Sequence, residues 1–123
     1  MTITEAINKI DSLKHNTYSQ SDKLDWLSRL DAMVTKHIID THEGAEDVTF
    51  KGYDDLTELS TELLVPAPYD EMYLRWMEAQ IDYHNGEYNK YNNAILMFNA
   101  DYEAYRNYYN RTHMPKSKSF KYF

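Results

Sequence analysis

The sequence predicts a mainly α-helical single domain, a small bundle of about four helices with a short β-hairpin near residues 47–65. Three observations lead to this class. Only three Gly and three Pro occur in 123 residues, too few for a turn-rich β-sandwich. Apolar residues make up 42% of the chain and recur at helical intervals in four stretches. A chain of this length buries roughly two thirds of its unfolded surface, which suits one core.

The first two helices are predicted at about 3–14 and 21–40. Thr2 and Glu5 have the spacing of a capping box, and isoleucines follow them at helical intervals. The second stretch carries a broad apolar face that begins at Trp26, with most of its charged residues elsewhere. Both helices are therefore expected to pack one face against a core.

Residues 41–67 are expected to form an acidic, mobile loop. Between residues 40 and 62 the chain holds eight acids and one base. Residues 48–51 alternate apolar and polar side chains with the period of a strand, and they pair with 62–65 in the expected hairpin. Two prolines then end this segment, because each fixes its own φ and restricts the residue before it.

A third helix is predicted after Pro68 and a fourth helical stretch reaches Asn110, with Asn85-Gly86 between them. Gly86 either ends the third helix in a left-handed conformation, which gives a helical hairpin, or lies inside one long helix at a cost of about 1 kcal/mol. We favour the hairpin. The long helix stays open as an alternative, because apolar side chains keep steps of three or four through the glycine.

An aromatic seam, defined by seven side chains, runs along the fourth stretch. Its gaps alternate between three and four residues, which is the repeat of a helix that packs along another helix. Tyrosine brings a large apolar area and a hydroxyl that needs a partner or water when the ring is covered. We interpret the seam as a subunit or partner interface; packing within the chain against the second helix is about equally expected. The seven residues are Tyr88, Tyr91, Ile95, Phe98, Tyr102, Tyr105 and Tyr109.

Charge divides the chain into an acidic domain, residues 1–110, and a basic C-terminal tail, residues 111–123. The net charge is −7, and an acidic body repels phosphate, so sequence-specific nucleic-acid binding is not expected. The tail holds four bases and no acid. It is either a contact for an acidic neighbour or a frayed terminus. The contact hypothesis rests on Arg111, Lys116, Lys118 and Lys121.

No catalytic, cofactor or metal site is predicted, and we expect the chain not to be an enzyme. There is no Cys, and no phosphate-binding loop, nucleophile elbow or zinc-protease motif occurs. His37, Asp40 and His42 lie close in sequence, but histidines five residues apart on a helix lie about 140° apart around it. We interpret them as surface residues near a helix C-terminus. No apolar run is long enough to predict a membrane span.

Two stretches, "LLVPAPYDEMYLRWMEAQIDYHNGEYNKYNN" (63–93) and "FNADYEAYRNYYNRTHMP" (98–115), resemble small proteins of tailed-phage and prophage structural modules, of the head-tail connector (adaptor) type. The resemblance implies a non-catalytic virion assembly protein that contacts copies of itself, in a ring, and virion proteins such as the portal. Its location would be the virion, after assembly in the host bacterial cytoplasm, with only passive contact with packaged DNA. The alternative is a small cytoplasmic helical regulator or inhibitor that binds one host or phage protein.

Overall fold

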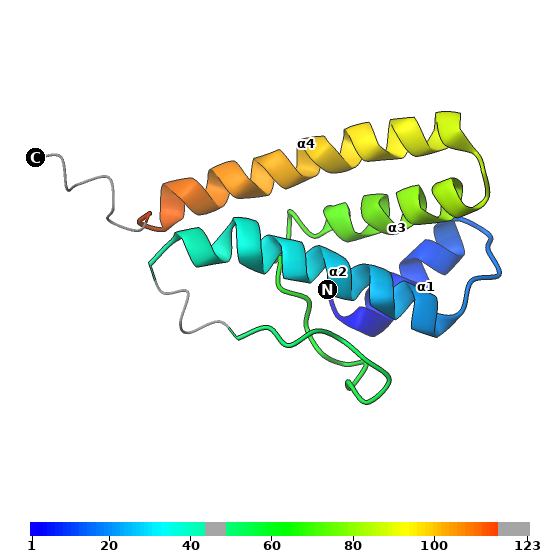
Figure 1. Ribbon diagram of the computed structural model, residues 1–123, viewed down its shortest axis with the longest axis horizontal. Helices are drawn as coiled ribbons and strands as arrows, with labels where there is room; N and C mark the ends of the chain where they lie inside the picture. Colours follow the sequence, from blue (N-terminus) through cyan, green and yellow to red (C-terminus); the bar gives the residue numbers. More distant parts are fainter. Residues whose placement is uncertain (44–48, 116–123) are drawn as a thin grey trace, which may run out of the picture.

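The computed structural model describes residues 1–43 and 49–115 (Figure 1). The described part contains four α-helices and one short 3₁₀ helix. The mainly helical class predicted from the sequence is therefore confirmed. In chain order the elements are α1 (Ile3–Leu13), α2 (Gln20–His37), η1 (Ile39–Thr41), α3 (Glu71–His84) and α4 (Tyr88–Thr112).

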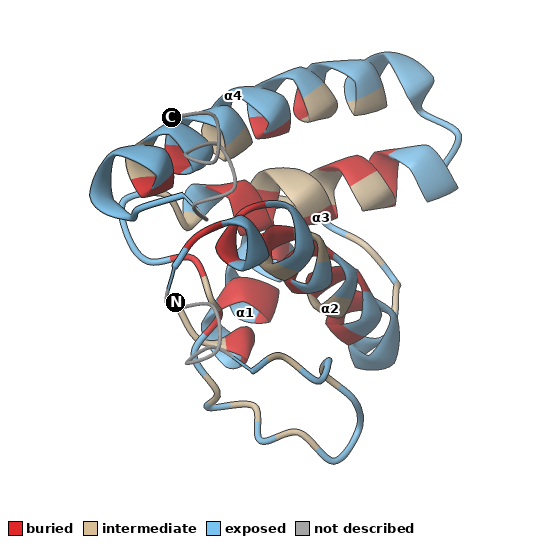
Figure 2. Cartoon of the chain, turned by 60° about the vertical axis from the view of Figure 1, so that its left-hand side comes forward, coloured by how far each residue is buried: buried red, intermediate tan, exposed pale blue. Residues whose placement is uncertain are grey.

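Helix α3 lies at the centre of the bundle. It packs against α4 on one side and against α1 and α2 on the other. Burying a large apolar side chain contributes about 1.5–3 kcal/mol relative to leaving it exposed, so this helix supplies much of the core. In Figure 2 most of α4 is exposed, with its buried residues on the side that faces α3. The fully buried residues of α3 include Met72, Tyr73, Met77 and Ile81.

The helix starts follow the local signals of the sequence. The Thr2 hydroxyl accepts a hydrogen bond from the Glu5 amide at 3.1 Å, and the Glu5 carboxylate accepts one from the Thr2 amide at 3.0 Å. This is the predicted capping box. Ser19 caps α2 by accepting from the Asp22 amide at 3.1 Å. Helix α2 ends at His37, earlier than predicted, and the chain continues into η1.

The β-hairpin expected near 47–65 is wrong for the part of it that the structure describes. Residues 49–65 contain no strand, and residues 47 and 48 lie outside the described ranges. The segment pairs with the N-terminus instead: the Ile3 amide donates to the Thr61 carbonyl at 3.0 Å, and the Leu63 amide donates to the Met1 carbonyl at 3.0 Å. These contacts satisfy backbone groups that the hairpin would have paired internally.

The chain reverses between α3 and α4 in a tight turn, so the favoured hairpin at Asn85-Gly86 is confirmed. Gly86 has φ +76°. Its amide donates to the Tyr83 carbonyl at 3.1 Å, and the Glu87 amide donates to the Asp82 carbonyl at 2.9 Å. These two bonds form a Schellman motif, which satisfies the last carbonyls of α3. Helix α4 can then run back along α3.

Replacing Gly86 with alanine is expected to lower the free energy of unfolding by about 1 kcal/mol, because a side chain disfavours the left-handed conformation. The cost is conformational alone, since a Cβ at this position would meet no atom within 4 Å. Urea unfolding measures the loss. Asn89→Ala, at an exposed site in α4, is the control and should cost nothing. An unchanged stability for Gly86→Ala would show that the turn does not require this conformation.

Candidate functional site

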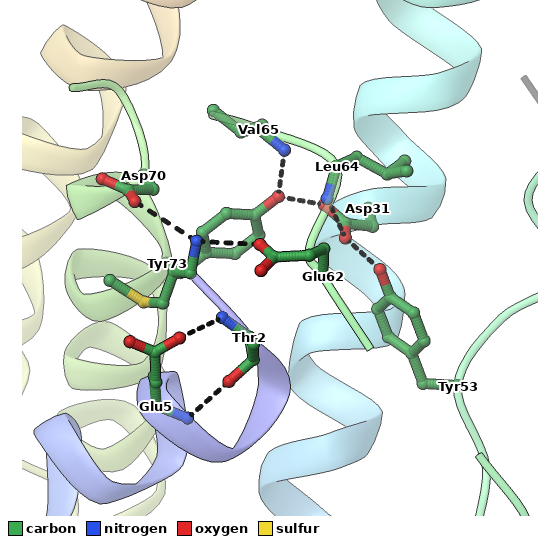
Figure 3. Close-up of polar contacts among 10 residues, drawn as sticks. Thr2, Glu5, Asp31, Tyr53, Glu62, Leu64, Val65, Asp70 and Tyr73 are labelled. Carbon is green, nitrogen blue, oxygen red and sulfur yellow. Dashed lines mark hydrogen bonds and ion pairs between the residues drawn. The ribbon is translucent and has the colours of Figure 1, made fainter. Parts of the chain in front are cut away.

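A buried carboxylate joins α2, α3 and the segment between them (Figure 3). The Asp31 side chain is fully buried. It accepts hydrogen bonds from the Tyr53 hydroxyl at 2.5 Å, the Tyr73 hydroxyl at 2.6 Å and the Leu64 amide at 3.2 Å. The Tyr73 hydroxyl in turn accepts from the Val65 amide at 2.8 Å. We call these five residues the Asp31 cluster.

The electrostatics of the Asp31 cluster fit a structural role. Burial raises the pKa of the Asp31 carboxyl above its usual 3.8, although its three hydrogen bonds favour the charged form. Burial, and then the Asp31 charge, raise the pKa values of Tyr53 and Tyr73. Both phenols therefore stay protonated and donate to the carboxylate. With Asp31 at 0% exposure, a substrate has no access to it, and the cluster fastens the segment around Tyr53 and Leu64 to the bundle.

Sequence reasoning missed the Asp31 cluster, although one signal was present. Asp31 lies on the same helical face as Leu27, Leu30 and Val34, all of them buried. An acid on the apolar face of a helix needs a buried hydrogen-bond partner. Its partners Tyr53 and Tyr73 come from distant parts of the sequence. The pattern therefore indicates that Asp31 needs a hydrogen-bond partner but does not indicate which residues provide it.

Some side chains of the aromatic seam are buried in the core, and the others lie on a partly exposed side of α4. A repeat of 3.5 residues drifts by about 20° per heptad around a straight helix, so one side of another helix cannot cover the whole seam. The covering helix is α3 rather than the expected α2: the rings of Trp76 and Phe98 lie 5.1 Å apart. Phe98, Tyr105 and Tyr109 are buried; Tyr91, Ile95 and Tyr102 are half-buried; Tyr88 is 61% exposed.

Two tyrosines of the seam show how burial affects the hydroxyl. Burial raises the pKa of Tyr105 to about 12, so its hydroxyl is neutral at physiological pH. The Tyr102 hydroxyl is buried without a hydrogen-bond partner among the described residues. Whether the seam is also an interface stays a prediction.

An aromatic groove of about 390 Å³ lies between the N-terminal half of α2 and the C-terminal half of α3. Within it the rings of Trp26 and His84 are stacked, with centroids 5.8 Å apart and an interplanar angle of 11°. Tyr18 meets the edge of Trp26 at 5.5 Å and donates a hydrogen bond to the Asn85 side chain at 2.6 Å. The groove is lined by Asp22, Asp25, Trp26, Arg29, Gln80, Tyr83 and His84.

The aromatic groove carries more negative than positive formal charge. Asp25 pairs with Arg29 at 2.8 Å, one turn further along α2. Asp22 forms no ion pair with any residue in the described ranges. Cations bind favourably over aromatic faces and beside carboxylates, so the groove suits a lysine or arginine side chain that carries apolar neighbours.

Exposed apolar side chains gather near the turn between α3 and α4. Tyr83 is 51% exposed and its ring lies 5.5 Å from that of Tyr91 and 6.1 Å from that of Tyr88. Further along α4, Leu96 is 67% exposed and Met97 is 46% exposed. Clusters of large exposed apolar side chains mark sites of protein contact more often than isolated ones do. We call Tyr83, Tyr88 and Tyr91 the hairpin-end surface.

His42 is buried, so the interpretation of it as a surface residue is wrong. Its Nδ1 lies 2.6 Å from the Ile38 carbonyl oxygen and therefore donates, while Nε2 lies 2.8 Å from the Oδ1 atom of Asn110. Its ring also contacts Tyr109 edge-on at 4.8 Å. His42 thereby joins η1 to the end of α4. His37 and Asp40 are exposed, and the described residues contain no group of three metal-binding side chains around them.

One residue of the predicted tail contact, Arg111, lies at the other end of α4. Arg111 is exposed in the last turn of that helix, which continues to Thr112, beyond the predicted domain boundary at 110. Lys116, Lys118 and Lys121 lie outside the described residues. Their role in binding an acidic neighbour stays a prediction.

None of the helices in the described ranges combines the length and the apolar character that crossing a membrane requires. Two candidate sites stand out among the described residues. One is the closed Asp31 cluster, and the other is the open aromatic groove, which shares Tyr83 with the hairpin-end surface. Comparison of the chain with protein-family models, with curated proteins and with solved structures finds no match.

Proposed function

We propose that the chain is a non-catalytic assembly protein of a tailed-phage particle, of the head-tail connector type, that acts through protein–protein contacts. The observation that carries this proposal is the hairpin-end surface, where Tyr83 and Tyr88 are each more than half exposed and Tyr83 also lines the aromatic groove. Such a surface gains free energy when another protein covers it. The resemblance of 63–93 and 98–115 to phage structural proteins is the reason for assigning the chain to a phage particle.

A contact role is supported over catalysis by the chemistry of the groups near the surface. The carboxyl with the raised pKa, Asp31, is fully enclosed and hydrogen-bonded. The open groove presents the ring of His84, which stacks on the buried Trp26, together with two carboxylates, of which Asp25 is paired to Arg29. Proton transfer needs a base within hydrogen-bond reach of a substrate and oriented for it, whereas binding needs only complementary surface.

Charge supports a location next to packaged DNA without tight binding to it. Residues 1–110 hold all 20 acids and nine of the 13 bases, a net charge of −11. A surface of this sign repels phosphate, so a ring of such domains would let DNA pass without retaining it. The partners proposed are copies of the chain itself and other virion proteins such as the portal.

The second candidate function is a small cytoplasmic regulator or inhibitor that binds one host or phage protein. The compact size of the aromatic groove, about 390 Å³, favours it, because a single concave site accepts a short peptide from one partner. The two functions differ in where the chain is found. An assembly protein remains in the finished particle, and a regulator does not.

Quantitative mass spectrometry of purified particles, from a host strain that carries the gene in its phage or prophage, distinguishes the two functions. The proposal predicts that the chain is present at a constant ratio to the portal protein. Variants Tyr83→Lys and Tyr88→Lys should lower this ratio, and Glu58→Lys, an exposed site elsewhere, should leave it unchanged. A chain abundant in lysate and absent from particles would contradict the proposal and favour the regulator.

A further inference from the structure

We propose that the aromatic groove of one copy binds residues 116–123, the end of the basic tail, of a second copy. This inference rests on the proposed function, because it names the contact by which copies join. The tail segment reads "KSKSFKYF", with Lys116, Lys118 and Lys121 beside three aromatic residues. A segment that combines cations and aromatic rings is the occupant that an acidic, aromatic groove fits.

The complementarity has two parts. The groove offers the carboxylate of Asp22, which has no ion pair among the described residues, to a lysine of the tail. It also offers the ring of Tyr83, which is 51% exposed, to the tail's Phe120. Aromatic pairs add about 0.5–1.5 kcal/mol beyond the area that they bury, and a cation over a ring adds about 0.5–1 kcal/mol at an exposed site.

The same copy cannot supply the tail, because the groove lies at the opposite end of the molecule. Figure 1 shows the turn between α3 and α4 at one end of the longest axis and the C-terminal end of α4 at the other. Tyr83 in the groove packs beside Tyr91, and the 21 residues from Tyr91 to Thr112 span about 32 Å of helix.

The tail starts from a fixed point, which limits its reach. The Glu43 amide donates to the Met114 carbonyl at 2.8 Å, and Pro115 forms an isolated bridge with His42. From Pro115, a fully extended chain places Phe120 at most about 18 Å away and Phe123 at most about 29 Å away. Both distances fall short of the aromatic end of the groove, about 32 Å along α4. A second copy is therefore required.

The contact joins two different surfaces, so it can repeat from copy to copy. Each copy keeps a free tail after its groove is filled, and a free groove after its tail is bound. Heterologous contacts of this kind close into rings where the rotation between copies allows, and otherwise extend as chains. The ring implied for a connector is one product of this geometry.

Sedimentation velocity of full-length variants tests the contact. The tail variant carries Phe120→Ser and Phe123→Ser, and the groove variant carries Asp22→Lys and Tyr83→Lys. Wild type is expected to form species of several times 14.7 kDa, and each variant alone to remain at 14.7 kDa. An equal mixture should give a species of twice that mass and no larger, because one intact tail meets one intact groove. Glu58→Lys, which matches the charge change of Asp22→Lys but lies outside the groove, should behave as wild type.

Three results would overturn the inference: a monomeric wild type over a wide concentration range, variants that associate as wild type does, or a mixture that stays monomeric. Thermal unfolding of each variant shows that it is folded, since all the groove substitutions are at exposed positions. A monomeric wild type that is nevertheless found in particles removes the tail contact and leaves the proposed function. Tail-dependent association in a chain that is absent from particles keeps the tail contact and removes the proposed function.

Discussion

Asp31→Ala is expected to lower the free energy of unfolding by about 3 kcal/mol, because it removes the acceptor that one buried and two partly buried donors share. The hydroxyls of Tyr53 and Tyr73 and the amide of Leu64 all donate to this carboxylate. An unpaired buried donor costs about 1–3 kcal/mol. Relief from burying a charge offsets part of the total. The segment that carries Tyr53 and Leu64 would also lose its attachment to α2.

Urea unfolding followed by circular dichroism measures this loss. Asp31→Asn is the matched variant, because it keeps the shape and one acceptor oxygen but replaces the other with a donor. We expect a smaller loss for it than for alanine. Asp25→Ala, at an exposed position of the same helix, is the control and should change stability by less than about 1 kcal/mol. Equal stability of wild type and Asp31→Ala would show that the cluster contributes nothing to the fold.

The difference in stability between wild type and Asp31→Asn is expected to depend on pH with a definite sign. The folded-state pKa of Asp31 is raised above its usual 3.8, so the folded state holds this proton more tightly than the unfolded state. The contribution of Asp31 is therefore fully present below pH 3.8 and declines as pH rises through the raised pKa. The stability of wild type minus that of Asp31→Asn should fall over this range. A difference that rises with pH would mean that the pKa of Asp31 is lowered.

Phe98→Ala is expected to lower the free energy of unfolding by about 3–5 kcal/mol, the cost of emptying the site of a large aromatic ring in a core. Phe98 is 4% exposed and its ring contacts those of Trp76, from α3, and Tyr102. Removing the ring separates α4 from the helix against which it packs. Denaturant unfolding of the full-length chain measures the effect.

Leu96→Ala is the matched control, since Leu96 lies two residues away and is 67% exposed. Its stability should equal that of wild type, while its association with partners is the property expected to change. The two variants thus separate the core side of α4 from its outer side. A Phe98→Ala variant as stable as wild type but defective in association would contradict the position of this ring and support an interface for the whole seam.

Features that local interactions decide were predicted from the sequence. The capping box at Thr2 and Glu5 and the turn at Gly86 each depend on residues within one or two helical turns, and both are present in the structure. The helical class follows from such signals repeated along the chain. The residues that determine each of these features lie within a few positions of one another, so a single sequence is enough to predict them.

Features that distant residues decide were missed or left open. The pattern at 48–51 indicated a strand, but the backbone near Thr61 and Leu63 pairs with the N-terminus, a competitor that no local signal reveals. The burial of His42 depends on Asn110, 68 positions away. The heptad spacing of the seam indicated a helix packed alongside the fourth stretch but not that α3 would be that helix.

We propose that this chain works by binding other proteins, copies of itself and a portal among them. Light scattering of the full-length chain on a size-exclusion column, alone and mixed with portal protein, tests it most directly. We predict a mass of several times 14.7 kDa for the chain alone and elution with the portal after mixing. A mass of 14.7 kDa at every concentration, unchanged when portal protein is added, would contradict it.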